Sequence, residues 1–141
     1  MDSENHILTR IKELEYDIAH REELPQKPTH PNHPDELADS HILDQYKKDC
    51  DIFIKQIALY DKKLDEDYEL LKKQLLIWRG LVIELALSSK SPNPQNRKNL
   101  DHVFDKTINT NELLNKIFSR ESSCFLLLIE KRELFISKIL Q

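Results

Sequence analysis

The amino-acid sequence predicts an all-α fold, namely an extended helical coiled-coil rod with a helical hairpin, packed in a multi-chain bundle. Apolar residues between positions 43 and 85 recur at alternating spacings of three and four, which is the heptad pattern of coiled-coil helices. Prolines are confined to two short segments, and the single glycine, Gly80, lies inside the heptad region. The sequence therefore offers no glycine-rich turn of the kind that holds phosphates.

Composition and charge narrow the function classes. The 141 residues are 39% hydrophobic and 33% charged, which is typical of neither a disordered nor a membrane-spanning chain. The net charge of -4 comes from interspersed acidic and basic residues without a basic block, which disfavours direct binding to nucleic acid. No run of about 18 apolar residues and no secretory leader pattern occurs. We therefore expect a soluble, intracellular protein with no membrane partner.

Residues 1–24 predict a short amphipathic helix, running from about residue 3 to residue 23. Its apolar residues repeat at spacings of four, three and four, at Ile7, Ile11, Leu14 and Ile18. Asp2 or Ser3 can cap its first turn. A helix of this length is marginal alone, because nucleation is costly, so we expect it to dock on another element.

Residues 25–34 form a proline-rich linker in which Pro25, Pro28, Pro31 and Pro34 recur every three residues. Period three is the repeat of the polyproline II helix. Such a segment can be a ligand for an SH3-type groove or a stiff spacer between helices, and we favour the spacer. Lys27 is the only basic residue that could add ligand specificity.

Residues 35–88 predict one long coiled-coil helix, with Pro34 at its first position and His33 or Asn32 as its cap. The step from Leu64 to Tyr68 breaks the alternation, as a stutter does. We expect the heptad seam to be a partner interface. It comprises Leu43, Tyr46, Cys50, Phe53, Ile57, Tyr60, Leu64, Tyr68, Leu71, Leu75, Trp78, Val82 and Leu85.

The end of this helix, residues 70–87, is apolar on nearly every face. A helix of this kind is buried all round, so a multi-helix bundle or a groove in a larger partner is expected. Packing against shorter neighbours of the same chain is the alternative, and a core shared between chains is favoured. Trp78 is either an interface anchor or a core residue, and the sequence leaves both roles open.

Residues 89–94 predict a loop, and residues 95–141 predict C-terminal coiled-coil helices. Asn93 can cap the first of them, and Asn109 with Glu112 has the spacing of a capping box at a kink or new start. Folding back as a hairpin would bring residues 78–87 near residues 100–104. The expected interface positions in this region are Leu114, Ile117, Cys124, Leu128, Phe135 and Ile139.

The sequence shows no constellation of catalytic residues, so we expect no enzyme activity and no cofactor. His30, His33 and His41 suggest a metal site, but Cys50 does not complete a set of zinc ligands, so no metal is expected. Cys50 and Cys124 lie in apolar stripes, where cysteine usually serves as a small core residue.

Part of the chain resembles the centromere protein H type of inner-kinetochore subunit. In residues 71–104 the resemblance lies in Lys73, Trp78, Val82, Leu85, Leu87, Ser88, Ser89, Leu100 and Val103. Residues 112–140, with the run from Glu130 to Leu134, are similar to the C-terminal coil of its budding-yeast counterpart. The resemblance implies a nuclear, non-enzymatic scaffold that links centromeric chromatin to outer kinetochore parts. It also implies pairing with a centromere protein K type subunit and docking of a helical-repeat subunit.

Other helical assemblies fit the same heptads. A helical-bundle subunit of a membrane-tethering or transcription complex is one alternative, and a homodimeric coiled-coil adaptor is another. The broad apolar faces favour a heteromeric subunit that behaves poorly without a different partner chain.

Overall fold

The computed structural model describes residues 2–21, 23, 26–88, 97–120 and 123–140. These residues form helices α1 (Asp2–Ala19), α2 (Ser40–Ser88), α3 (Arg97–Thr107), α4 (Thr110–Phe118) and α5 (Cys124–Leu140). They contain no β-strand, so the predicted all-α class is confirmed, and α2 is the expected long helix. The predicted loop at 89–94, including the expected Asn93 cap, lies outside the described residues.

The chain divides into two compact units, and the division falls inside α2. The bundle unit contains residues 1–22 and 69–141, and the linker unit contains residues 23–68. The boundary follows Tyr68, the residue at which the heptad alternation breaks. A stutter locally changes how an apolar stripe winds around its helix, so the two parts of α2 present different surfaces.

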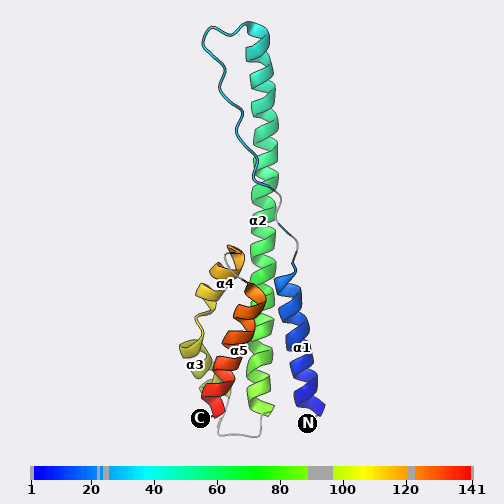
Figure 1. The fold of residues 1–141 in the computed structure, drawn as a ribbon, viewed down its shortest axis with the longest axis vertical. Coiled ribbons are helices and arrows are strands. Elements are labelled where there is room, and N and C mark those ends of the chain that lie inside the picture. The colour runs from blue at the N-terminus through cyan, green and yellow to red at the C-terminus, as the bar shows by residue number, and fades with distance from the viewer. Residues whose placement is uncertain (1, 22, 24–25, 89–96, 121–122, 141) are drawn as a thin grey trace. The chain divides into compact units, whose positions relative to one another are not determined.

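In the bundle unit, α1, the C-terminal part of α2, the pair α3 and α4, and α5 lie side by side (Figure 1). Successive members run in opposite directions, and α3 followed by α4 fills the third position. Helix α5 packs against both α1 and α3. This is the up-down-up-down arrangement of a four-helix bundle, with its third helix divided in two.

The bundle core joins large side chains from three helices. Trp78 of α2, Phe104 of α3 and Phe135 of α5 are all fully buried. The Trp78 and Phe104 rings meet edge to face with centroids 6.0 Å apart, and the Phe104 and Phe135 rings do so at 5.1 Å. Aromatic rings favour this geometry over face-to-face stacking. These contacts confirm the predicted hairpin, which was expected to bring residues 78–87 near residues 100–104.

Helix α1 docks inside the same chain, where Ile11 and Ile18 are completely buried. It ends at Ala19, four residues earlier than the sequence predicted. The Arg21 guanidinium donates hydrogen bonds to the carbonyl oxygens of Ile18 in α1, at 3.5 Å, and Ile117 in α4, at 3.0 Å. A basic side chain that satisfies the last carbonyl groups is a common way to end a helix.

Helix α2 begins at Ser40, and the prediction that it starts at residue 35 was wrong. Asp39 is the cap instead, because its carboxylate accepts a hydrogen bond from the backbone N–H of Ile42 at 3.0 Å. Asp35 forms a separate turn, in which its carbonyl oxygen accepts from Ala38 N–H at 2.9 Å. Aspartate is among the strongest N-cap residues, and Asp39, in place of the expected His33 or Asn32, accepts from the first turn of the helix.

The expected break near residue 109 is confirmed. The Asn109 side chain accepts a hydrogen bond from the backbone N–H of Glu112 at 3.1 Å, and Asn109 has the extended backbone of an N-cap residue. Ile108, just before it, is buried. Ile108 therefore stays in the core between α3 and α4, and α4 begins after it with Asn109 as its own N-cap.

Substituting Asn109 tests the role of this cap. We expect Asn109→Ala to destabilise the bundle by about 1 kcal/mol, because one first-turn N–H of α4 loses its acceptor. Asn111→Ala, an exposed position two residues further on, is the matched control and is expected to change little. Urea denaturation followed by far-UV circular dichroism measures both, and equal midpoints would contradict the capping role.

Candidate interaction surface

Most of the predicted interface residues of the bundle unit are buried inside the chain's own core. They are Leu71, Leu75, Trp78, Val82, Leu85, Leu114, Ile117, Leu128 and Phe135. Cys124 and Ile139 are half-buried. The shared core that the sequence favoured is thus not required for this part of α2, since shorter helices of the same chain cover it. These residues form the core of the bundle unit. A partner chain would therefore contact other side chains of this unit.

Trp78 illustrates this placement. Its side chain has 0% exposure, and its indole Nε1–H donates a hydrogen bond to a carboxylate oxygen of Glu15 at 3.0 Å. Buried tryptophans usually find an acceptor for this N–H. Of the two roles that the sequence left open, the structure gives Trp78 that of a core residue.

Glu15 also forms an ion pair with the guanidinium of Arg132, a residue of α5. Arg132 donates from Nε to one oxygen of Glu15 at 2.9 Å, and from Nη2 to the other oxygen at 3.2 Å. Glu15 is completely buried, and Arg132 is 8% exposed. Together with Trp78, this bidentate ion pair ties α1, α2 and α5 in one polar network. A buried charge is tolerated only with partners of this kind.

Sequence reasoning missed this network, although a signal was present. Glu15 lies four residues after Ile11 and three before Ile18, which places it in the middle of the apolar stripe of α1. Arg132 likewise lies four residues after Leu128 and three before Phe135, in the middle of the apolar stripe of α5. Opposite charges at core positions of two amphipathic helices indicate a buried pair between them.

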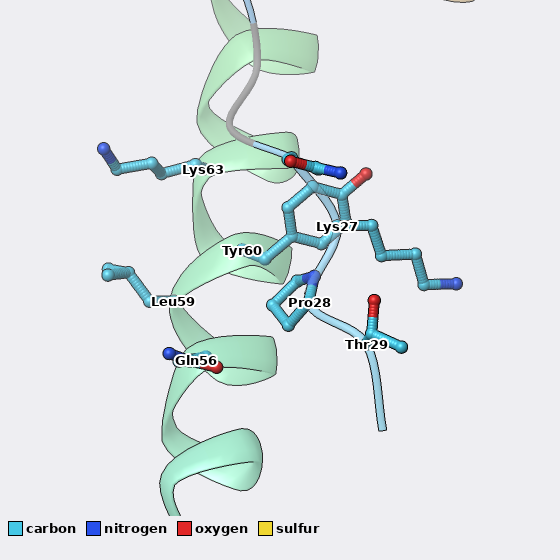
Figure 2. A pocket seen from close by; sticks show the side chains of 8 residues that line it. Lys27, Pro28, Thr29, Gln56, Leu59, Tyr60 and Lys63 are labelled. Carbon is cyan, nitrogen blue, oxygen red and sulfur yellow. The ribbon is translucent and has the colours of Figure 1, made fainter. Parts of the chain in front are cut away.

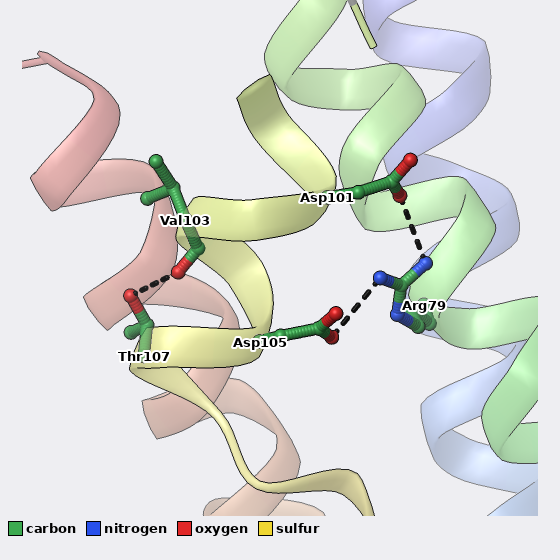
Figure 3. A network of polar contacts seen from close by, with 5 residues as sticks. All are labelled: Arg79, Asp101, Val103, Asp105 and Thr107. Atoms are coloured by element: carbon green, nitrogen blue, oxygen red, sulfur yellow. Dashed lines mark hydrogen bonds and ion pairs between the residues drawn. The ribbon is translucent and has the colours of Figure 1, made fainter. Parts of the chain in front are cut away.

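A second polar cluster fixes α3 on α2 (Figure 3). The guanidinium of Arg79 donates to Asp101 and Asp105, each at 3.0 Å, and lies 5.0 Å from the centre of the Phe104 ring. Burial acts to lower the pKa of Arg79, but the two carboxylates outweigh it and raise the pKa above its ordinary value. Thr107 donates to the carbonyl oxygen of Val103 at 2.7 Å. The cluster holds α3 against α2 at the partly exposed edge of the core.

In the linker unit the predicted seam is partly covered by the chain itself. Residues 26–34, which we call the proline segment, run alongside the N-terminal part of α2 (Figure 1). Leu43 is exposed, and the other seam residues are half-buried, namely Tyr46, Cys50, Phe53, Ile57, Tyr60, Leu64 and Tyr68. Hydrogen bonding with Cys50, four residues further on, raises the pKa of Tyr46.

A pocket of about 420 Å³ opens between the proline segment and α2 (Figure 2). It is lined by Gln26, Lys27, Pro28, Thr29, Gln56, Leu59, Tyr60 and Lys63. Figure 2 shows the ammonium groups of Lys27 and Lys63 pointing in different directions. Because the two cations do not converge, the pocket does not have the geometry of an anion site.

A second apolar stripe on α2 is exposed in the linker unit, and its Leu59, Gln56 and Lys63 also line the pocket. Ile52 and Leu59 lie one heptad apart and are 53% and 57% exposed. Residues that lie three or four positions apart on a helix are neighbours on its surface. The neighbours of Ile52 and Leu59 defined in this way are mostly basic. They are Lys48, Asp49, Lys55, Gln56, Lys62 and Lys63. We call Ile52, Leu59 and these neighbours the basic stripe.

Within the described residues, no group of three or more histidine, cysteine, aspartate or glutamate side chains is placed to hold a metal ion. None of the described helices is both long and apolar enough to cross a membrane. Searches of protein-family models, curated proteins and solved structures find no match to this chain.

Proposed function

We propose that this chain is a non-enzymatic structural subunit of a heteromeric coiled-coil assembly. The observation that carries the proposal is the basic stripe, in which Ile52 and Leu59 stand exposed one heptad apart. Both units leave large apolar side chains exposed, among them Leu76 and Leu126 in the bundle unit, but in the basic stripe the exposed pair is bordered by lysines. Exposed apolar residues with a polar border are typical of interaction sites.

The chemistry of the stripe indicates the kind of partner. Apolar residues at heptad spacing fit the seam of a second helix, and four lysines flank this pair on its two sides. In coiled coils the flanking charges select partners of opposite sign. The partner is therefore an amphipathic helix whose flanking residues are acidic, and its pairing with the stripe weakens as salt is raised.

The cellular place of the subunit is proposed from the resemblance to centromere protein H type subunits. On this proposal the chain is a nuclear inner-kinetochore scaffold that links centromeric chromatin to outer kinetochore parts. A centromere protein K type subunit supplies the acidic helix, and a helical-repeat subunit docks on the assembly. Trp78, Val82 and Leu85, which contribute to the resemblance, pack in the bundle core. They maintain the fold and leave the basic stripe for the partner.

Changing the stripe tests the proposal in solution. Without its acidic partner, the purified wild-type chain is expected to self-associate through Ile52 and Leu59 at high salt, which screens the lysines that otherwise repel a second copy. Ile52→Gln with Leu59→Gln is expected to shift the chain to a monomer without lowering its unfolding midpoint, since both residues are exposed. Size-exclusion chromatography with light scattering measures the masses.

The matched control is Asp51→Gln with Ala58→Gln. These exposed residues precede Ile52 and Leu59 by one position, so they have the same heptad spacing on a different face of α2. The control should associate like the wild type. A wild-type chain that is a stable, monodisperse monomer at high salt would contradict the proposal that this subunit needs a partner.

A further inference from the structure

The proline segment contains a repeated unit that the proposed function does not use. His30 and His33 each precede a proline, and the Nδ1–H of each ring donates to the carbonyl oxygen of that proline, at 2.7 and 2.8 Å. The two histidines are three residues apart, which is the period of the prolines. The hydrogen bonds fix both imidazole rings in the same orientation relative to their own backbone.

Each ring of the repeat meets an aromatic residue of α2. The His30 ring lies 5.0 Å from the Phe53 ring at 66°, and the His33 ring lies 5.2 Å from the Tyr46 ring at 58°. A step of three residues along the proline segment thus corresponds to a step of seven along α2. The later histidine contacts the earlier aromatic residue of α2, so the proline segment and α2 run antiparallel. This is expected because the chain turns back between them.

Elementary dimensions explain why three residues match seven. Seven residues of an α-helix rise about 10.5 Å, and three residues of a polyproline II helix rise about 9.3 Å. The difference of about 1 Å per repeat is small enough for side chains to absorb over a few repeats. An extended proline repeat and a heptad helix can therefore keep contact side by side.

The same register extends to a third pair. Lys27 lies three residues before His30, and Tyr60 lies seven after Phe53. Lys27, the adjacent Pro28 and Tyr60 line the same pocket (Figure 2). Pro28, Pro31 and Pro34 are half-buried, whereas all the residues between them, including His30 and His33, are exposed. The prolines from Pro28 to Pro34 thus form the more buried edge of the segment, while both imidazole rings contact α2 from exposed positions.

From this register we infer that the α2 seam from Tyr46 to Tyr60 is a binding surface for an extended proline-repeat peptide, and that its occupant is the chain's own proline segment. Aromatic rings spaced along a groove are the usual receptors of such peptides, which lose little conformational entropy on binding. The inference is independent of the proposed function, because all its contacts lie within one chain.

The occupied seam has a consequence for assembly. Tyr46, Phe53 and Tyr60 are the positions that a helix pairing along the heptad seam would contact. The proline segment and such a helix therefore compete for one surface, so a partner that leaves the segment in place must use another face of α2. Release of the segment would expose the seam and free the His-Pro repeat at the same time.

Removing both imidazole rings tests the inference. His30→Ala with His33→Ala is compared with Thr29→Ala and Asn32→Ala, which alter the exposed residue before each histidine. An amine-reactive crosslinker long enough to span the two ammonium groups is expected to join Lys27 to Lys63, which line the same pocket, in the wild type and in the control. We expect the histidine variant to lose most of this crosslink, measured by peptide mass spectrometry.

Cys50 supplies a second readout, because it is half-buried on the seam between Tyr46 and Phe53. In a Cys124→Ser background, the histidine variant is expected to react with a thiol reagent about tenfold faster, since two ring contacts that hold the segment closed are lost. Unchanged crosslinking and unchanged thiol reactivity would overturn the inference. A Lys27 to Lys63 crosslink found only between differently isotope-labelled copies would also overturn it, because the occupant would then be a second chain.

Discussion

Replacing Glu15 with alanine is expected to destabilise the bundle by about 3 to 5 kcal/mol, the cost of breaking a buried ion pair from one side. The substitution leaves the guanidinium of Arg132 buried without its carboxylate, and it also removes the acceptor of the Trp78 indole N–H. Urea denaturation measures the loss. Trp78 is the only tryptophan, so its fluorescence reports on this unit alone.

Two further variants separate the ion pair from a general effect on α1. Glu13→Ala changes an exposed glutamate of the same helix and is expected to be neutral within about 0.5 kcal/mol. Glu15→Met combined with Arg132→Met is expected to recover much of the loss, because no uncompensated charge stays buried. If Glu15→Ala were as harmless as Glu13→Ala, Glu15 would not be the buried partner of Arg132.

Trp78→Ala is the second substitution with a large expected effect, about 3 to 5 kcal/mol of destabilisation. The indole ring is fully buried against Phe104, and its removal leaves a cavity that neighbouring helices fill only in part. Far-UV circular dichroism has to follow the unfolding of this variant, because its fluorescent residue is gone.

Ile77→Ala is the matched control for Trp78→Ala. Ile77 is the preceding residue on α2 and is 54% exposed, so its truncation opens no cavity and should change stability by less than about 0.5 kcal/mol. Trp78→Phe removes the N–H and part of the indole ring, so it is expected to lose less stability than Trp78→Ala. An unchanged midpoint for Trp78→Ala would refute its place in the core.

Local patterns predicted much of this fold. The heptad spacing identified α2, and the spacing of Asn109 and Glu112 identified the break before α4, because both signals lie within a few residues of the chain. The hairpin contact between Trp78 and Phe104 followed from two apolar stripes joined by a proline-marked break. These elements depend on neighbours in sequence, which a single chain displays directly.

Features that depend on competition or on distant residues escaped prediction. The start of α2 was misplaced because Pro34 and Asp39 both offer a helix beginning, and the side chain of Asp39 provides the better cap. Glu15 and Arg132 each interrupt an apolar stripe, but they lie 117 positions apart, so the local patterns mark each charge without showing which residue it pairs with. The period of the prolines predicted an extended segment but not the α2 seam as its surface, which is a tertiary contact.

The most direct test of the central proposal is affinity purification of the tagged full-length chain from its native cell, with stoichiometry read by mass spectrometry. The wild type and the Asp51→Gln, Ala58→Gln control should each recover another helical subunit in equimolar amount, and Ile52→Gln with Leu59→Gln should lose it. Equimolar recovery of kinetochore subunits would support the inner-kinetochore proposal, and recovery of a different helical complex would replace it. Recovery of the wild-type chain alone would contradict a heteromeric subunit.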